Sequence, residues 1–125
     1  MAEQDQALAS MVAKLGIGAY KRHVLLCTGP KCCSEEQGMA AWEVLKAQLK
    51  EKGLLAGENA CYRTKVGCLR ICLSGPTALV YPEGTWYHGL TAERIAEFVQ
   101  QHLKENRPLE GQVFARNPLP QQTEA

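Results

Sequence analysis

The stretch that decides the fold of this chain reads Gly67-Cys68-Leu69-Arg70-Ile71-Cys72-Leu73-Ser74-Gly75-Pro76. Its two cysteines lie in a short loop with a glycine on each side, and a proline closes the loop before the strand-like run Thr77–Tyr81. A second cysteine group, Cys27 with Cys32 and Cys33, lies upstream. A fold that joins the two groups would create a pocket of four thiolates.

The composition is that of a single globular domain. The chain has 125 residues and a net charge of +1, and such a small charge predicts no affinity for nucleic acid or for a membrane surface. The longest apolar runs have about five residues, whereas a membrane-spanning helix needs about twenty. The polar, acidic N-terminus lacks the features of a signal peptide, so we expect a reducing, cytoplasmic location.

Six cysteines are many for a cytoplasmic protein of this length. In that compartment, clustered cysteines more often bind a metal or carry out redox chemistry than form a disulfide framework. Buried structural thiols are the alternative, because free cysteine packs well as a small hydrophobe. The Cx4CC and Cx3C spacings favour a ligand site. Cys61, which shares a strand face with Arg63 and Lys65, is interpreted as a bystander thiol.

The N-terminal segment, residues 1–19, has the pattern of an amphipathic helix. Its apolar residues recur at the spacing of one helical face, and Gly16 is well placed to end the helix. Such a face usually packs on the body of the protein, so we expect a docked helical extension. The residues that form the face are Leu8, Met11, Val12 and Leu15.

A strand, a helix and a second strand are predicted next. The apolar run His23–Cys27 suits a strand that is covered on both faces. Ser34 and Gln37 then fit a capping box that opens a helix ending near Lys52. The alternating run Ala60–Val66 predicts the next strand. The buried stripe of the helix is predicted to consist of Met39, Trp42, Leu45 and Leu49.

The rest of the chain predicts a hairpin, a helix and a tail. Pro82-Glu83-Gly84 joins the strands Thr77–Tyr81 and Thr85–His88. Thr91 is placed to cap the last helix, and residues 107–125 form a tail that contains Val113 and Phe114. The apolar face of the last helix is predicted to consist of Ile95, Phe98, Val99 and Leu103.

This order of elements predicts an α/β fold. The crossover helix makes the first two strands parallel, whereas the hairpin is antiparallel. We therefore expect a small mixed sheet of about four strands flanked by helices, thioredoxin-like in outline, over residues 20–106. Gly75-Pro76 stands where thioredoxin-like folds usually carry a cis-proline.

Three kinds of chemistry suit the cysteines to different degrees. Thiol–disulfide exchange usually needs Cys-x-x-Cys at a helix start, which this chain lacks. A structural zinc site accepts pairs spaced Cx2–4C, so a four-cysteine zinc-binding protein is a serious alternative. A 2Fe-2S cluster takes two thiolates per iron, which two pairs from separate loops match. Nearby positive charge from Lys31, Lys65 and Arg70 would stabilise the reduced cluster.

The run from Cys68 to Thr91, which includes the stretch Val80-Tyr-Pro-Glu-Gly-Thr-Trp-Tyr87, closely resembles the thioredoxin-like 2Fe-2S ferredoxins. These are relatives of the small 2Fe-2S subunit of respiratory complex I and of bidirectional hydrogenases. The resemblance covers roughly residues 20–110. It implies a one-electron carrier rather than an enzyme, one 2Fe-2S cluster as cofactor, redox proteins as partners, and a homodimer.

The resemblance also assigns ligands to positions of this chain. Cys27 matches the first ligand, Cys68 the third and Cys72 the fourth. For the second ligand, Cx4C spacing as in the complex I relatives selects Cys32. In this family a glycine usually follows the second ligand, and counting back from Gly38 selects Cys33. We take Cys32 as the ligand and keep Cys33 as the alternative.

Overall fold

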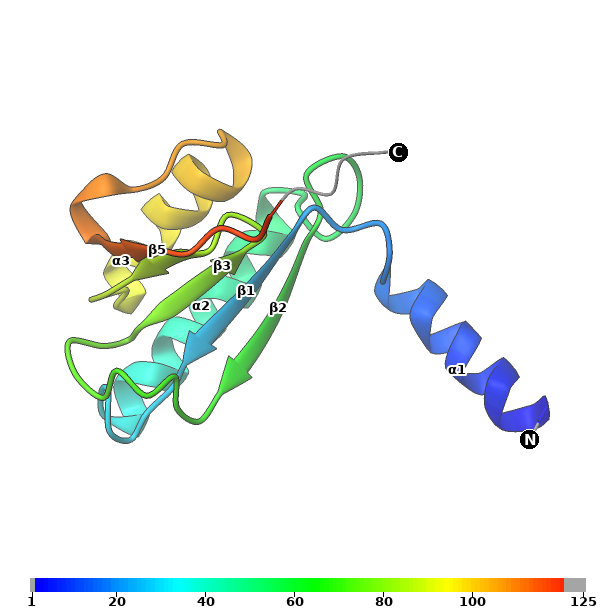
Figure 1. The fold of residues 1–125 in the computed structure, drawn as a ribbon, viewed down its shortest axis with the longest axis horizontal. Helices are drawn as coiled ribbons and strands as arrows, with labels where there is room; N and C mark the ends of the chain where they lie inside the picture. Colours follow the sequence, from blue (N-terminus) through cyan, green and yellow to red (C-terminus); the bar gives the residue numbers. More distant parts are fainter. Residues whose placement is uncertain (1, 121–125) are drawn as a thin grey trace.

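The computed structural model describes residues 2–120, and within them five strands form one mixed sheet in the order β2-β1-β3-β4-β5 (Figure 1). β1 pairs with β2 in parallel, and the other neighbouring strands are antiparallel. The predicted thioredoxin-like mixed sheet is confirmed. The strands are β1 Arg22–Cys27, β2 Cys61–Val66, β3 Ala78–Tyr81, β4 Thr85–Tyr87 and β5 Val113–Arg116.

The fifth strand comes from the segment that the sequence pattern assigned to the tail. β5 pairs with β4, and a register shift between Trp86 and Tyr87 interrupts the pairing. Phe114 in this strand is 43% exposed, so the strand has no regular buried face that a period of two could reveal. For this reason the sequence pattern predicted four strands and missed the fifth.

Helix α2, Glu35–Glu51, begins with the predicted capping box. The Gln37 N–H donates to Ser34 Oγ at 3.1 Å, and the Ser34 N–H donates to Gln37 Oε1 at 3.4 Å. Gly53, with a φ of +71°, follows the helix as expected. Three residues of the predicted buried stripe, Trp42, Leu45 and Leu49, are buried.

Met39 does not belong to that stripe, because its side chain is 39% exposed. The first turns of α2 instead turn Gly38 and Ala41 inward. A Cβ on Gly38 would lie 2.3 Å from the Thr28 carbonyl oxygen, so the helix approaches the preceding loop at a position only glycine fits. With Gly38 facing the loop, Met39 points to solvent.

The last helix, α3, spans Ala92–Phe98 and continues into the π-helix η1, Val99–Lys104. The predicted apolar face is confirmed, since its four residues are fully buried. Thr91 occupies the N-cap position, but its side chain makes no capping hydrogen bond. The short 3₁₀ helix η2, Glu110–Gln112, then leads into β5.

The hydrophobic core lies on one face of the sheet. Side chains of α2, α3 and η1 pack there against Val24 and Leu26 of β1. His23 and Leu25, which lie on the opposite face of the strand, are only half-buried. The prediction that β1 is covered on both faces is therefore wrong, because in residues 2–120 the packed helices share one face.

Helix α1, Ala2–Leu15, projects away from the sheet (Figure 1). None of these residues is buried, and Leu8 is 65% exposed. The prediction of a docked helix is therefore wrong. The pattern correctly identified an apolar face, but periodicity does not specify what covers it.

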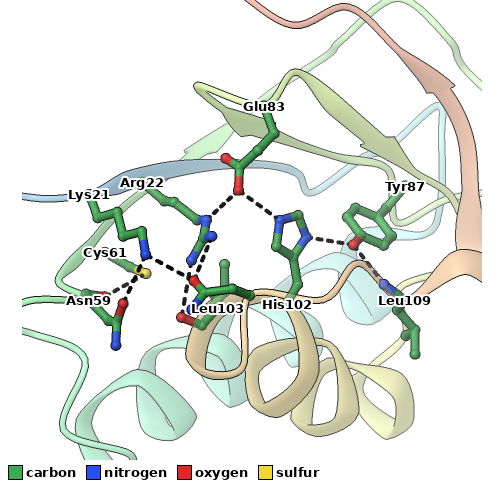
Figure 2. A network of polar contacts seen from close by, with 10 residues as sticks. Lys21, Arg22, Asn59, Cys61, Glu83, Tyr87, His102, Leu103 and Leu109 are labelled. Atoms are coloured by element: carbon green, nitrogen blue, oxygen red, sulfur yellow. Dashed lines mark hydrogen bonds and ion pairs between the residues drawn. The ribbon is translucent and has the colours of Figure 1, made fainter.

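A partly buried polar network lies at the end of the sheet opposite Cys27 (Figure 2). Arg22 Nε donates to Glu83 Oε2 at 2.5 Å, and His102 Nε2 lies 3.2 Å from the same oxygen. The Tyr87 hydroxyl is 2.6 Å from His102 Nδ1 and accepts from the Leu109 N–H at 3.0 Å. The Tyr87 proton is thereby directed to Nδ1, which leaves Nε2–H to donate to Glu83.

The network joins β1, the β3–β4 turn and η1. Burial would raise the pKa of Glu83, but hydrogen bonds from His102 and Arg22 outweigh it and lower the pKa to about 2. A carboxylate with a lowered pKa in the folded state stabilises the fold above its unfolded pKa, and that contribution is lost as the pH falls toward 2.

We expect Glu83→Gln to lower the free energy of unfolding at pH 7 by about 1–3 kcal/mol, because Arg22 loses its charged partner. The difference from wild type should shrink as the pH falls from about 4.5 toward 2. Urea unfolding at several pH values measures this. Glu58→Gln, at an exposed loop residue, is the matched control. An equal loss at every pH would contradict the assigned role of the Glu83 charge.

Candidate metal centre

Two loops leave the sheet at the same end, and each carries a pair of cysteines. Cys27 is the last residue of β1, and the loop that follows it carries Cys32 and Cys33. The other loop, between β2 and β3, carries Cys68 and Cys72. Because β1 lies between β2 and β3 in the sheet, both loops begin beside Cys27. Main-chain hydrogen bonds fix this end, from the Cys27 N–H to the Thr77 carbonyl at 2.8 Å and from the Thr28 N–H to the Val66 carbonyl at 3.1 Å.

The thiols gather as two pairs. Cys27 Sγ and Cys32 Sγ are 2.6 Å apart, and Cys68 Sγ and Cys72 Sγ are 3.7 Å apart. The first pair is buried and the second is exposed. In residues 2–120, no set of three or more His, Cys, Asp or Glu side chains converges on one point. The four sulfur atoms thus form two separate pairs.

Of the other two cysteines, Cys33 lies beside the first pair and Cys61 lies at the far end of β1. Cys33 Sγ is 3.8 Å from Cys32 Sγ and is half-buried. Cys61 pairs in register with Arg22, at the far end of β1 from Cys27. Burial raises the pKa of Cys61 to about 11, so it remains a protonated thiol.

Glycines let the two cysteine loops pack against each other. The Gly75 N–H donates to the Cys32 carbonyl at 2.8 Å, and a Cβ on Gly75 would lie 2.4 Å from that oxygen. Gly29, with a φ of +91°, would place a Cβ 2.5 Å from the Cys33 carbonyl oxygen. Neither position accepts a side chain without moving a loop. The peptide bond between Gly75 and Pro76 is cis.

The loop between β2 and β3 has an unusual backbone. Arg70, Cys72 and Ser74 all have positive φ, at 71°, 61° and 55°, and alternate with residues of negative φ. Such alternation turns successive N–H groups toward one side and forms concavities that bind anions. The Arg70 N–H donates to Cys68 Sγ at 3.2 Å, as expected for this geometry.

These surroundings act differently on the thiols. The hydrogen bond from the Arg70 N–H, together with one from Cys72, lowers the pKa of Cys68. The hydrogen bond between the Cys72 and Cys68 side chains raises the pKa of Cys72. In the other pair, burial and the hydrogen bond with Cys32 raise the pKa of Cys27. The pKa of Cys68 is thus shifted toward the thiolate, which is the form that binds metals.

The residues at the site suit an iron–sulfur group. Their sulfur donors form two pairs, and the main-chain N–H of Arg70 already donates to one sulfur. The sequence pattern predicted these four cysteines as ligands, which stays a prediction, but it gave no sign of this donor. Arg, Cys and Ser seldom adopt positive φ, so no residue type here signalled the loop geometry.

The sequence is similar to those of known 2Fe-2S ferredoxins. It is 30% identical over 88 residues to one from Clostridium pasteurianum, which covers 67% of this chain and 86% of that protein. It is also 30% identical over 107 residues to one from Aquifex aeolicus (strain VF5), covering 79% of this chain and 94% of that protein. No protein-family model matches the sequence.

The fold matches a solved structure of a thioredoxin-like 2Fe-2S ferredoxin from Aquifex aeolicus. The TM-score is 0.69 at 26% sequence identity, and the match covers 84% of this chain and all of that one. A second structure of this kind from the same organism, at 1.5 Å resolution, matches with a TM-score of 0.67 at 27% identity, covering 78% of this chain and 99% of that one. The chain belongs to the thioredoxin-like 2Fe-2S ferredoxin family.

Proposed function

We propose that this protein is a one-electron carrier that binds a single 2Fe-2S cluster through Cys27, Cys32, Cys68 and Cys72. The observation that carries the proposal is the presence of two thiol pairs, on two loops at one end of the sheet, in a chain of the ferredoxin family. When bound, such a cluster supplies a redox centre that takes up and releases one electron.

The residues around the site supply what an electron carrier needs. Burial of Cys27 and Cys32 excludes water from one side, whereas Cys68 and Cys72 lie at the surface. Electron transfer requires close approach of a redox partner and no general acid, base or nucleophile. Hydrogen bonds to thiolate sulfur, such as the one from the Arg70 N–H, stabilise the reduced state and raise the reduction potential.

We expect protein purified without oxygen to be red-brown and to contain about two irons and two sulfides per chain, the stoichiometry of this cluster. Visible absorption, iron and sulfide analysis, and electron paramagnetic resonance after reduction measure this. A colourless protein that contains zinc would instead support the four-cysteine zinc alternative. Insulin-reducing activity in an iron-free protein would support a thiol oxidoreductase.

Cys32, rather than Cys33, is proposed as the second ligand because its sulfur lies 2.6 Å from that of Cys27. The Cys33 sulfur contacts the Cys32 sulfur at 3.8 Å. Cys61 is proposed as a bystander, since it lies at the other end of β1.

We expect Cys32→Ser to lose the cluster or to shift its visible bands, because an alkoxide is a harder ligand than a thiolate. Cys33→Ser and Cys61→Ser should keep the wild-type spectrum and are the matched controls. The measurement is the visible spectrum and the iron content of each variant. Loss of the cluster in Cys33→Ser, with a normal spectrum in Cys32→Ser, would make Cys33 the ligand.

We further propose that the protein acts in the cytoplasm as a homodimer that exchanges electrons with other redox proteins. In residues 2–120, no helix is both long and apolar enough to cross a membrane. The dimer follows from the family resemblance, and the uncovered apolar residues of α1 are available for contact with another chain. Sedimentation equilibrium should give about twice the chain mass. A monomer at micromolar concentration would contradict the proposed dimer.

The division of the chain into an N-terminal helical extension (1–19), a ferredoxin domain (20–106) and a C-terminal tail (107–125) stays a prediction.

A further inference from the structure

Helix α1 carries a row of apolar side chains that nothing in residues 2–120 covers. Leu8 is 65% exposed, Met11 is 47% exposed, and no residue of the helix is buried. The helix has 14 residues, and an isolated helix shorter than about 12–15 residues is only marginally stable in water. A packed contact along this face would therefore stabilise the helix as well as cover it.

The spacing of this row is that of a coiled-coil seam, with intervals of four, three and four residues. We define the seam as Gln4, Leu8, Met11 and Leu15. Ala7 completes a shallow hollow between the first three of these residues. Four residues at positions i, i+3, i+4 and i+7 form the kind of hole that receives a side chain from a facing helix. The seam and its hole therefore favour a second helix as the surface that covers α1.

Main-chain hydrogen bonds after α1 direct the helix away from its own sheet. The Gly16 N–H donates to the Ala13 carbonyl at 3.3 Å. The Ile17 N–H donates to the Val12 carbonyl at 3.1 Å, which completes a Schellman motif around the positive φ of Gly16. The Ala19 N–H then donates to the Gly16 carbonyl at 3.0 Å. With the end of the helix fixed in this way, α1 projects from the body of the protein and the seam faces outward (Figure 1).

The charges of α1 argue against a lipid surface as its cover. The helix has two acidic residues, Glu3 and Asp5, and one basic residue, Lys14. Helices that lie on membranes are instead rich in Lys and Arg on their polar face. Of the α-helices in residues 2–120, α2 and α3 already bury their apolar faces in the core. The helix of this chain that still has a free seam is α1 itself, so the matching surface is α1 of a second copy.

We propose that α1 pairs with α1 of a second copy as an antiparallel coiled coil, with Leu8 of each helix opposite Met11 of the other. This inference rests on the homodimer of the proposed function and specifies its interface. In this register Met11 of the second copy enters the hole beside Leu8, where a flexible methionine side chain packs well. The same register places Gln4 of one copy opposite Leu15 of the other.

Charge and shape both select the antiparallel orientation. A parallel pair would bring the acidic first turns of the two helices together, and apposed like charges cost free energy. It would also crowd the two bodies of the dimer at one end, because each α1 joins its body at its C-terminus (Figure 1). The antiparallel pair instead places Glu3 of one copy beside Lys14 of the other, on the same side of the seam.

The antiparallel pair also carries the start of each helix to the body of the other copy. A hollow of about 220 Å³ lies where the end of α1 meets the loop after α2, and its lining includes Leu15, Tyr20 and Leu55. Leu55 is exposed, and the first turn of the second α1 would lie beside it. Two-fold symmetry repeats this contact. The hollows thereby extend a helix pair that is small beside the roughly 1,200–2,000 Å² of a stable interface.

Charge placed on the seam tests the interface. We expect Leu8→Glu in the full-length holoprotein to raise the dissociation constant of the dimer by about 30-fold or more, because it would bury an unpaired carboxylate. Gln6→Glu makes the same change of charge on the opposite face of α1 and should stay within about twofold of wild type. Met11→Lys, of opposite charge, should act like Leu8→Glu. Sedimentation equilibrium over a range of concentrations measures each dissociation constant.

Zero-length crosslinking with a carbodiimide tests the orientation. Lys14 and Glu3 are about 16 Å apart along one helix, so an amide bond between their side chains has to join two copies. We expect this crosslink in the covalent dimer, identified by peptide mass spectrometry. Lys14→Gln should abolish it, whereas Lys50→Gln, in the last turn of α2, should leave it in place. A covalent dimer without the crosslink between Lys14 and Glu3 would overturn the antiparallel pair.

The visible spectrum of each variant separates this inference from the proposed function. A monomeric Leu8→Glu protein with the wild-type spectrum would support the α1 interface, because the body of the protein is then intact. A dimer that Leu8→Glu leaves unchanged would place the contact elsewhere and overturn the inference alone. A monomeric wild-type protein, with α1 packed on its own body or exposed, would overturn both the inference and the proposed dimer. Absence of iron would refute the electron-carrier function, and sedimentation of the same sample would still decide whether α1 pairs.

Discussion

The candidate metal centre depends on the contact between the two cysteine loops. The Gly75 N–H donates to the Cys32 carbonyl at 2.8 Å, and a Cβ on Gly75 would lie only 2.4 Å from that oxygen. This contact sets the segment that carries Cys68 and Cys72 against the one that carries Cys32. Two residues that lie far apart in the sequence thereby hold both thiol pairs at one end of the sheet.

The sheet makes that contact possible, and the far end of the fold stabilises the sheet. β1 lies between β2 and β3, so the end of β2 and the start of β3 both lie beside Cys27. At the opposite end, Arg22 and His102 both contact Glu83 in the β3–β4 turn. These polar groups thus lie at the opposite end of β1 from Cys27.

The sequence predicted the parts of this structure that local pattern encodes. The capping box of Ser34, the hairpin around Gly84 and the buried face of α3 each depend on residues close together in the chain. The four cysteines could be singled out as candidate ligands because the Cx4CC and Cx3C spacings favour a ligand site. The sequence pattern missed three features that depend on what lies against a segment in space. These are the exposure of Met39, the projection of α1 and the strand β5. The positive φ of Arg70 was missed because its residue type gives no sign of it.

The difference in exposure between the two thiol pairs gives the site a direction. Cys27 and Cys32 are buried beneath the sheet end, and Cys68 and Cys72 are exposed on a loop that also carries Arg70 and Leu73. Electron transfer slows steeply with distance, so a partner gains most by approaching the exposed pair. The loop that supplies Cys68 and Cys72 would therefore form the side of the proposed centre that a redox partner approaches.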